Sequence, residues 1–318
     1  MSRLKNILFV LALGAVVALS GTTDLFADSP DQQAKDLSVM VRNGIRLSLM
    51  TSEREYSTSE YPIFISTLQN VAEKTKEGLR RVDPMKYGWK HPAYTPSKTI
   101  HIHEKLSGKE VRTVLPGMPA HTYKTVLEPG EKHTDIILFQ EITKDGTKPL
   151  PEGDYKVTQP GFVIAELKVV KNLNRKPIST KGMSEKELQK ILHDPKTSPG
   201  ARLRLLQDIH ASKRKPVFWQ LITDCDDAFA VIMMLEHLDR DWLDIDGLKK
   251  LSRSNDLSVR GAALRAFSRL GKNEDAAKWL SDFLATQKDG LVLRDGKDAL
   301  EVLQGTKKPN PLNPPPMK

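Results

Sequence analysis

The stretch NDLSVRGAALRAFSRLG, residues 255–271, carries the clearest structural signal in the sequence. Its apolar residues recur at the spacing of an α-helix, and so do those of residues 276–284, which include Trp279 and Phe283. A helix of this kind buries one face and exposes the other. The sequence therefore predicts two consecutive amphipathic helices.

The residues before this stretch keep the helical period and contain well-marked helix starts. Ser184 and Glu187 form a capping box, while Ser198 and Pro199 supply an N-cap and a first-turn proline. Further helices are expected to start at Pro216, at Asp226 or Asp227, and at Asp246. The C-terminal part of the chain is therefore predicted to be all-α.

Residues 255–271 resemble the first helix of a HEAT-type repeat, and residues 276–284 resemble its paired second helix. Residues 198–211 follow the first-helix pattern less closely. Because such helix pairs cannot bury their apolar stripes alone, the resemblance implies an array of stacked pairs, for which residues 184–304 provide room. An irregular helical bundle is the alternative.

The N-terminal half follows the two-residue period of β-strands. Ile45, Leu47 and Leu49 alternate with other residues, and turns rich in glycine and proline separate this run from similar ones. The expected strands are residues 44–50, 61–68, 99–103, 122–127, 134–139, 154–158 and 162–170. So many short strands in about 130 residues predict a β-sandwich.

Two stretches of this half resemble bacterial immunoglobulin-like sandwiches, including the BsuPI-type proteinase-inhibitor family. They are LEPGEKHTDIIL, residues 127–138, and LPEGDYKV, residues 150–157. The resemblance implies that Tyr155 and Val157 face the core, and it makes protease inhibition an alternative function. Residues 71–96 depart from the pattern because they are long and polar for a connection between strands.

The complete prediction has two structural domains. An all-β immunoglobulin-like sandwich at residues 36–170 is followed by a polar linker at 171–183 and by an all-α HEAT-like array at 184–304. Residues 305–318 form a proline-rich tail that we expect to be extended and poorly ordered.

The N-terminus predicts export. Arg3 and Lys5 precede an apolar or small run at residues 7–19, which suits the core of a signal peptide and falls short of the ~20 residues of a membrane-spanning helix. Cleavage is expected after Ala27, with Ser20 as the alternative site, so residues 1–27 are the predicted signal peptide. The expected location is the periplasm or the extracellular space, and an uncleaved membrane anchor is the alternative.

Cys225 is the only cysteine, which excludes a disulfide within the chain and a site with several thiolate ligands. It lies in the segment TDCDD, whose carboxylates are expected to raise the pKa of the thiol. The sequence therefore favours a structural cysteine over a nucleophile.

His101 and His103 are the best candidates for metal ligands, because residues two apart share one face of a strand. His133 is a further candidate, and His121 lies in the same half. A cupin-type metal site would need a glutamate at position 107 or 108, where the sequence has serine and glycine. Ordinary polar residues on the solvent face of a strand are therefore the preferred interpretation, and no cofactor is predicted.

No catalytic motif occurs, so nothing in the sequence supports an enzyme, and a metal-dependent enzyme using His101 and His103 is kept as the least favoured alternative. The preferred function is an exported scaffold that binds a protein partner in the cell envelope. Arg260, Arg265 and Arg269 could line one binding face, although a structural contact with a loop carboxylate is preferred for Arg260.

The net charge of +9 is unevenly distributed along the chain. Residues 171–215 carry 12 basic and 4 acidic side chains, so this region could contact an acidic surface or a polyanion. Its basic residues are not interleaved with aromatic ones, which argues against a specific nucleic-acid partner. A solvated surface is the simpler interpretation.

Overall fold

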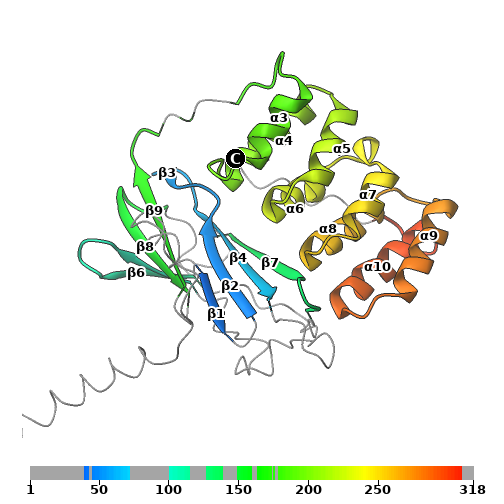
Figure 1. Cartoon of the computed structure of the whole chain (residues 1–318), viewed down its shortest axis with the longest axis horizontal. Coiled ribbons are helices and arrows are strands. Elements are labelled where there is room, and N and C mark those ends of the chain that lie inside the picture. The colour runs from blue at the N-terminus through cyan, green and yellow to red at the C-terminus, as the bar shows by residue number, and fades with distance from the viewer. Residues whose placement is uncertain are drawn as a thin grey trace, which may run out of the picture. The chain divides into compact units, whose positions relative to one another are not determined.

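The computed structural model describes two β-sheets followed by a helical region (Figure 1). The residues that it describes are 39–42, 45–71, 100–114, 127–138, 149–159, 163–173, 175 and 178–309. The predicted signal peptide, His121, the polar segment at 72–96 and the last residues of the tail lie outside this part of the chain. Within the described part, no helix has the length and apolar character needed to cross a membrane.

Four strands form the first sheet, in the order β1-β2-β4-β7, and all neighbours are antiparallel. The second sheet has five strands in the order β3-β9-β8-β5-β6, where β3 runs parallel to β9 and the other pairs are antiparallel. The strands are β1 (Val39–Arg42), β2 (Ile45–Thr51), β3 (Glu55–Ser57), β4 (Ile63–Asn70), β5 (Ile100–Glu104), β6 (Glu110–Val114), β7 (Lys132–Leu138), β8 (Gly153–Gln159) and β9 (Val163–Val170).

Strands β1, β3 and β6 are not predicted by the sequence pattern, and each of them is an outer strand of its sheet. They have four, three and five residues, so the two-residue period has little length in which to show itself. Short outer strands are common in natural sheets, because a short edge limits pairing with another chain.

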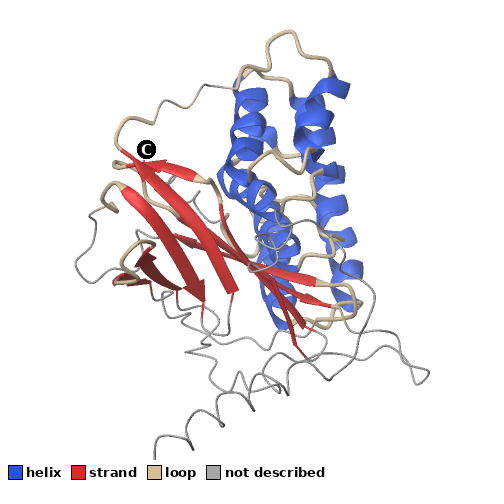
Figure 2. Cartoon of the chain, turned by 60° about the vertical axis from the view of Figure 1, so that its left-hand side comes forward, coloured by secondary structure: helices blue, strands red, loops and turns tan. Residues whose placement is uncertain are grey.

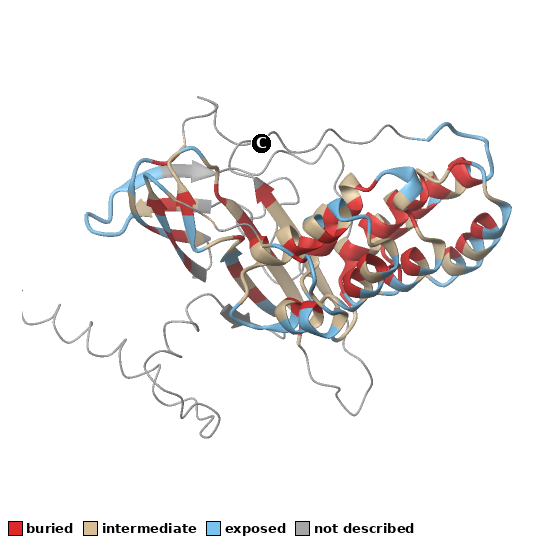
Figure 3. Ribbon diagram, turned by 90° about the horizontal axis from the view of Figure 1, so that it is seen from above, coloured by how far each residue is buried: buried red, intermediate tan, exposed pale blue. Residues whose placement is uncertain are grey.

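The two sheets share one apolar core (Figures 2 and 3). Leu47, Leu49 and Phe64 contribute from the first sheet, and Tyr155 and Val157 contribute from the second. Tyr155 is 4% exposed and Val157 is 0% exposed, which confirms the predicted inward direction of both side chains. The Tyr155 hydroxyl donates to the carbonyl of Pro151 at 2.9 Å, so the ring is buried while its polar atom is satisfied.

The helices are α3 (Glu185–His193), α4 (Pro199–Ala211), α5 (Lys215–Asp224), α6 (Ala228–His237), α7 (Ile245–Leu251), α8 (Leu257–Phe267), α9 (Glu274–Ala285) and α10 (Gly290–Leu303), with a short 3₁₀ turn at Arg240–Trp242. The capping box of Ser184 and Glu187 is confirmed, and Asp227 caps α6. The expected cap at Asp246 is two residues too late, because Asp244 caps α7 by accepting from the backbone N–H of Gly247 at 2.7 Å.

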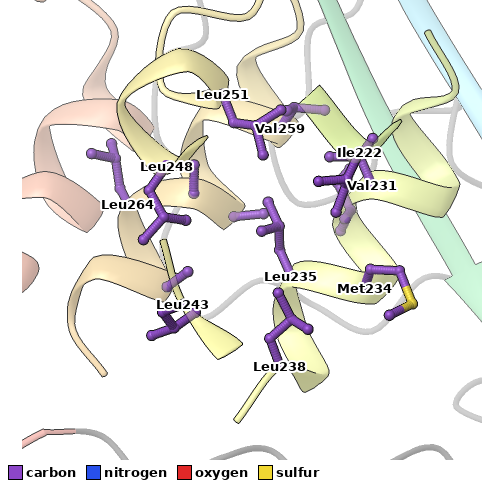
Figure 4. Packing of buried hydrophobic residues seen from close by; sticks show 14 of the residues in the cluster. Ile222, Val231, Met234, Leu235, Leu238, Leu243, Leu248, Leu251, Val259 and Leu264 are labelled. Carbon is purple, nitrogen blue, oxygen red and sulfur yellow. The ribbon is translucent and has the colours of Figure 1, made fainter. Parts of the chain in front are cut away.

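The even-numbered helices pack in a row, α4 on α6, α6 on α8 and α8 on α10, while α3, α5 and α7 make a second row. Their apolar faces meet in a large core in which Leu235 of α6, Leu248 of α7 and Leu264 of α8 are each fully buried (Figure 4). This core extends onto the sheets, since it includes Leu127 and contacts Ile136 of β7.

Candidate functional site

Strand β7 and the start of α8 are joined by hydrogen bonds rather than by apolar contact alone. The backbone N–H of Lys132 donates to the carbonyl of Asn255 at 2.8 Å, which extends the sheet by one bridge toward the loop before α8. Asp256 caps α8 by accepting from the N–H groups of Ser258 and Val259, and it also accepts from the Thr134 hydroxyl at 2.6 Å. One carboxylate that is 3% exposed therefore caps a helix and binds a strand.

Two further pairs surround this contact. Arg260 donates to the Glu131 carboxylate at 2.6 Å, and both side chains are about 15% exposed (15% and 14%). The structural contact with a loop carboxylate that the sequence favoured for Arg260 is thus present. Next to it, Ser258 Oγ lies 3.1 Å from Nδ1 of His133.

A second contact joins the sheets to α4 through Glu53. Its carboxylate accepts from the Ser198 hydroxyl at 2.7 Å and from the Arg204 guanidinium. The backbone N–H of Gly200 donates to the carbonyl of Ser52 at 2.8 Å. A Cβ atom at position 200 would collide with the Glu53 carboxylate and press on the Ser52 carbonyl, so a larger residue here would require Glu53 to move.

The segment at 171–183 is held from both sides. Arg175 donates to the Glu60 carboxylate and to the carbonyl of Glu55 in the sheet region. Thr180 is fully buried and donates through its hydroxyl to Asp208 of α4 at 2.6 Å. These bonds fix the described residues of the segment at either end.

Between these contacts the chain forms a groove of about 990 Å³. Its floor is the face of the first sheet that points away from the sandwich core, and its wall comes from the α5–α6 loop, α7 and the loop before α8. The side chains of the floor are Arg46, Ser48, Met50, Ile65, Thr67, Gln69, Lys132 and Thr134. This groove is the candidate functional site.

The acidic side chains of the wall are largely committed to basic neighbours. Asp227, whose side chain is 7% exposed, lies 3.0 Å from Arg202. Asp224 lies 2.6 Å from Lys250, and Asp246 lies 3.3 Å from Lys249. Asp226 differs, because its side chain is 98% exposed and its contact with His193 is 3.9 Å long.

Cys225 also lines the groove, between these aspartates. Burial is the largest cause of a rise in the pKa of its thiol to about 12, and the charge of Asp227 adds to the rise. The expected direction is confirmed, although burial outweighs the neighbouring carboxylates. The thiol is therefore protonated at neutral pH, and this state is unsuited to nucleophilic attack.

The candidate metal ligands are separated by the fold. His101 and His103 lie on β5 in the second sheet, with ring centroids 6.4 Å apart, and His101 Nδ1 lies 3.3 Å from Glu110. His133 lies on β7 in the first sheet, 3.4 Å from Asp135. No group of three or more metal-ligating side chains occurs among the described residues.

The three candidate binding arginines have their contacts inside the chain. Arg260 reaches Glu131, as described above. Arg265 binds Glu236 and lies 2.5 Å from Asp295, so it connects α6, α8 and α10. Arg269 donates to the carbonyls at the end of α6, including that of Glu236 at 2.9 Å. None of the three lines the groove described here.

The groove itself was not anticipated from the sequence. The alternation in β2 places Arg46, Ser48 and Met50 on the face opposite Leu47 and Leu49, and this pattern is visible in the sequence. The pattern predicts a solvent-facing surface. It contains no signal that helices far along the chain would pack beside that surface.

The chain was compared with known proteins. No protein-family model matches it, and no curated protein matches it. Among solved structures it is similar to the CARDB domain of the PF1109 protein from Pyrococcus furiosus, determined in complex with di-metal ions, with 12% identity, a TM-score of 0.21, and coverage of 42% of this chain and 97% of that domain.

It is also similar to part of a β-glucosidase from Listeria innocua. The complex with gluconolactone matches with 14% identity and a TM-score of 0.23, and the complex with isofagomine matches with 16% identity and a TM-score of 0.22. Both alignments cover 40% of this chain but only 16% of the enzyme. TM-scores this low carry no inference about the fold or function of this chain.

Proposed function

We propose that the chain is an exported, non-enzymatic binding protein of the cell envelope that holds a protein partner in the groove between its sheets and its helices. The groove carries the proposal, because a concave site of about 990 Å³ is formed by residues from both halves of the chain. Its side chains combine hydrogen-bonding groups and ion pairs with apolar residues such as Met50 and Phe229, and the thiol among them is protonated.

The proposal includes an immunoglobulin-like sandwich and a HEAT-like array as the two structural domains. The bond from Tyr155 to the carbonyl four residues earlier supports the first, because immunoglobulin-like domains use a tyrosine in this way at a strand corner. The two rows of helices support the second, because helical repeats stack in layers. Export rests on the sequence of residues 1–27 alone.

Site-specific photo-crosslinking tests this function. A photo-reactive amino acid at position 50 replaces Met50, whose side chain lines the groove and is 46% exposed. In cells of the source organism we expect a covalent adduct with one partner protein. Ser48→Trp fills the groove floor and should abolish the adduct, whereas Lys156→Trp, on an exposed position of β8, should leave it unchanged. An adduct that survives Ser48→Trp would contradict the proposal.

Protease inhibition is the second candidate function, and the β5–β6 hairpin favours it. Leu106 at the tip of this hairpin is 96% exposed, which is the highest value for a large apolar side chain in the described part of the chain. The loop is held in shape by Gly108, whose N–H donates to the carbonyl of Glu104 at 2.9 Å, and by Lys105, which pairs with Glu166 at 2.9 Å. A hairpin loop with one highly exposed apolar residue suits insertion into a protease pocket.

A direct assay separates this second function from the first. The purified chain is added to a panel of serine, cysteine and metalloproteases, and inhibition of at least one enzyme should be lost in Leu106→Asp. The Ser48→Trp variant should inhibit equally well, since position 48 lies in the first sheet and Leu106 follows a strand of the second. Full activity of every protease would remove the second candidate.

A further inference from the structure

The floor of the groove is ordered in three rows that run across the first sheet. The register pairs Arg46 with Gln69 and Gln69 with Lys132, so these three residues form one row across β2, β4 and β7. The next row is Ser48, Thr67 and Thr134. The last row is Met50 and Ile65, and Ile136, the residue paired with Ile65, packs against the helical core instead of lining the groove. The floor therefore changes from cationic to hydroxyl-bearing to apolar along the strands.

The charged side chains of the cationic row, Arg46 and Lys132, can bind an anionic group. Arg46 is exposed and Lys132 is partly exposed, and neither side chain has an ion-pair partner within the part of the chain that the structure describes. In the wall, Asp224 and Asp227 are already paired with Lys250 and Arg202, and Asp226 is the carboxylate that stays exposed, with a 3.9 Å contact to His193. An anionic group at this end of the groove would gain ion pairs without displacing existing ones.

The other two rows specify the rest of the ligand. Thr67 and Thr134 share a hydrogen bond of 3.2 Å, while the side-chain hydroxyl of Ser48 has no hydrogen-bond partner among the described residues and can bind a polar group. Met50 is 46% exposed and the neighbouring Ile65 is 5% exposed, so Met50 supplies the accessible apolar surface of the last row. Successive rows lie about 6.6 Å apart, and the outer two about 13 Å, because a strand rises about 3.3 Å per residue.

We infer that the groove binds an extended segment of a partner protein that presents an acidic side chain, a polar side chain and an apolar side chain at positions i, i+2 and i+4. This inference rests on the proposed function and names the partner chemistry for the same site. An extended peptide places side chains of alternate residues on one face at the spacing of the three rows. Each side chain then meets a matching row, with the acid at Arg46 and Lys132 and the apolar residue at Met50.

The hydroxyl row decides between a peptide and an anionic lipid. A lipid would place its acyl chain directly after the headgroup, and the chain would then cover the Ser48 hydroxyl without satisfying it, whereas Thr67 and Thr134 already bind each other and Asp256. Covering polar groups with hydrocarbon costs free energy. A peptide offers backbone and side-chain polar groups at this position, so it fits all three rows.

Peptide display on the intact chain tests the inference. Random twelve-residue peptides are selected against the full protein, and the enriched sequences should carry Asp or Glu four positions from a large apolar residue. The double variant Arg46→Glu with Lys132→Glu should bind the selected peptides at least tenfold more weakly. The matched control Lys278→Glu with Lys297→Glu changes the charge equally at exposed positions of α9 and α10 and should bind normally.

The outcomes separate this inference from the proposed function. Selected peptides that lack the acidic and apolar pair would overturn the inference, and so would peptides that bind the double variant as tightly as the parent protein. The proposed function would still be tested by loss of the crosslinked adduct in Ser48→Trp. Absence of any enriched peptide would overturn both. Circular dichroism verifies folding, and Arg46→Gln with Lys132→Gln should give a smaller loss in the same direction. The photo-reactive residue at position 50 can also be tested with phosphatidylglycerol vesicles. Labelling of the lipid that requires Arg46 and Lys132 would overturn the inference of a peptide and identify an anionic lipid as the ligand.

Discussion

The sandwich and the helical region differ in how their parts are held together. Inside the sandwich, apolar residues such as Phe64 and Val157 from facing sheets make the contact. Between the sandwich and the helices, apolar contact at Ile136 is joined by Asp256, which is buried and bound to both sides. Apolar burial supplies most of the stability of either part, whereas the directional bonds at Asp256 specify how they meet.

This difference matters for function because the groove exists only where the two parts meet. Its floor belongs to the sheet and its wall belongs to the helices. A change that loosens the polar contact should therefore alter the groove while leaving each apolar core intact. The predictions below test whether the two parts act as one unit.

The largest effect is expected for Phe64→Ala in the sandwich core. Phe64 is fully buried, and loss of a buried phenylalanine costs about 3–5 kcal/mol of the free energy of unfolding. Trp219, Trp242 and Trp279 all lie in the helical region, so tryptophan fluorescence reports mainly on that region. If the parts unfold together, a urea titration followed by fluorescence should show the full loss. An unchanged fluorescence midpoint would show that they unfold separately.

Asp256→Ala should come next, with a loss of about 2–4 kcal/mol in the free energy of unfolding. The variant removes a helix cap, worth about 1 kcal/mol, and leaves the buried Thr134 hydroxyl without its acceptor, which costs a further 1–3 kcal/mol or so. Asp244→Ala is the matched control, because Asp244 caps α7 through Gly247. Its expected loss is about 1 kcal/mol. If both variants lost the same free energy of unfolding, the hydrogen bond between Asp256 and Thr134 would make no contribution to stability.

A smaller effect is expected for the pair Arg260 and Glu131. A double-mutant cycle with alanine at both positions should give a coupling energy of about 1–2 kcal/mol, because the pair is charge-assisted and largely shielded from water. Lys105 and Glu166, whose side chains are 50% and 62% exposed, form the control pair on the second sheet. Their coupling should be about 0–1 kcal/mol. A coupling near zero for Arg260 and Glu131 would contradict this prediction.

The smallest effect concerns the pH dependence that His210 adds within the helical region. Its ring centroid lies 4.0 Å from that of Trp242, its Nε2 atom has no hydrogen-bond partner among the described residues, and burial lowers its pKa. The unfolded chain therefore binds more protons than the folded chain below about pH 6.5, so stability should fall as the pH drops through this range. His210→Phe should reduce that loss in urea titrations at pH 7.5 and 5.5. The same loss in both proteins would exclude His210 as its source.

The sequence predicted the central strands and most of the helix starts because each depends on local chemistry. Leu47 and Leu49 alternate with residues of the opposite face over a whole strand, and Ser184 with Glu187 caps a helix within one turn. The outer strands were missed because they are short. Helix α10 was not predicted as a separate element because Gly296 interrupts its pattern, and the structure explains this residue, since a Cβ atom there would collide with Leu284.

The candidate site could not be predicted in the same way. The sequence contains Arg46, Lys132 and Asp256 but no information about their distance, since positions 46 and 256 meet only through packing of remote elements. The helical spacing of Arg265 and Arg269 predicted a shared binding face. Their contacts with Glu236 depend instead on how α8 packs on α6, which the spacing does not reveal. Local sequence patterns therefore predict individual helices and strands. Only the tertiary structure locates a groove that is formed between a sheet and several helices.

The most direct test of the account is whether the sandwich and the helices keep one fixed arrangement in solution. Spin labels at the exposed positions Lys156 on β8 and Lys297 on α10, in the full chain with Cys225→Ala, allow the distance between the two parts to be measured by double electron–electron resonance. The account predicts one narrow distance distribution that becomes broad in Asp256→Ala. A broad distribution in the parent protein would contradict it.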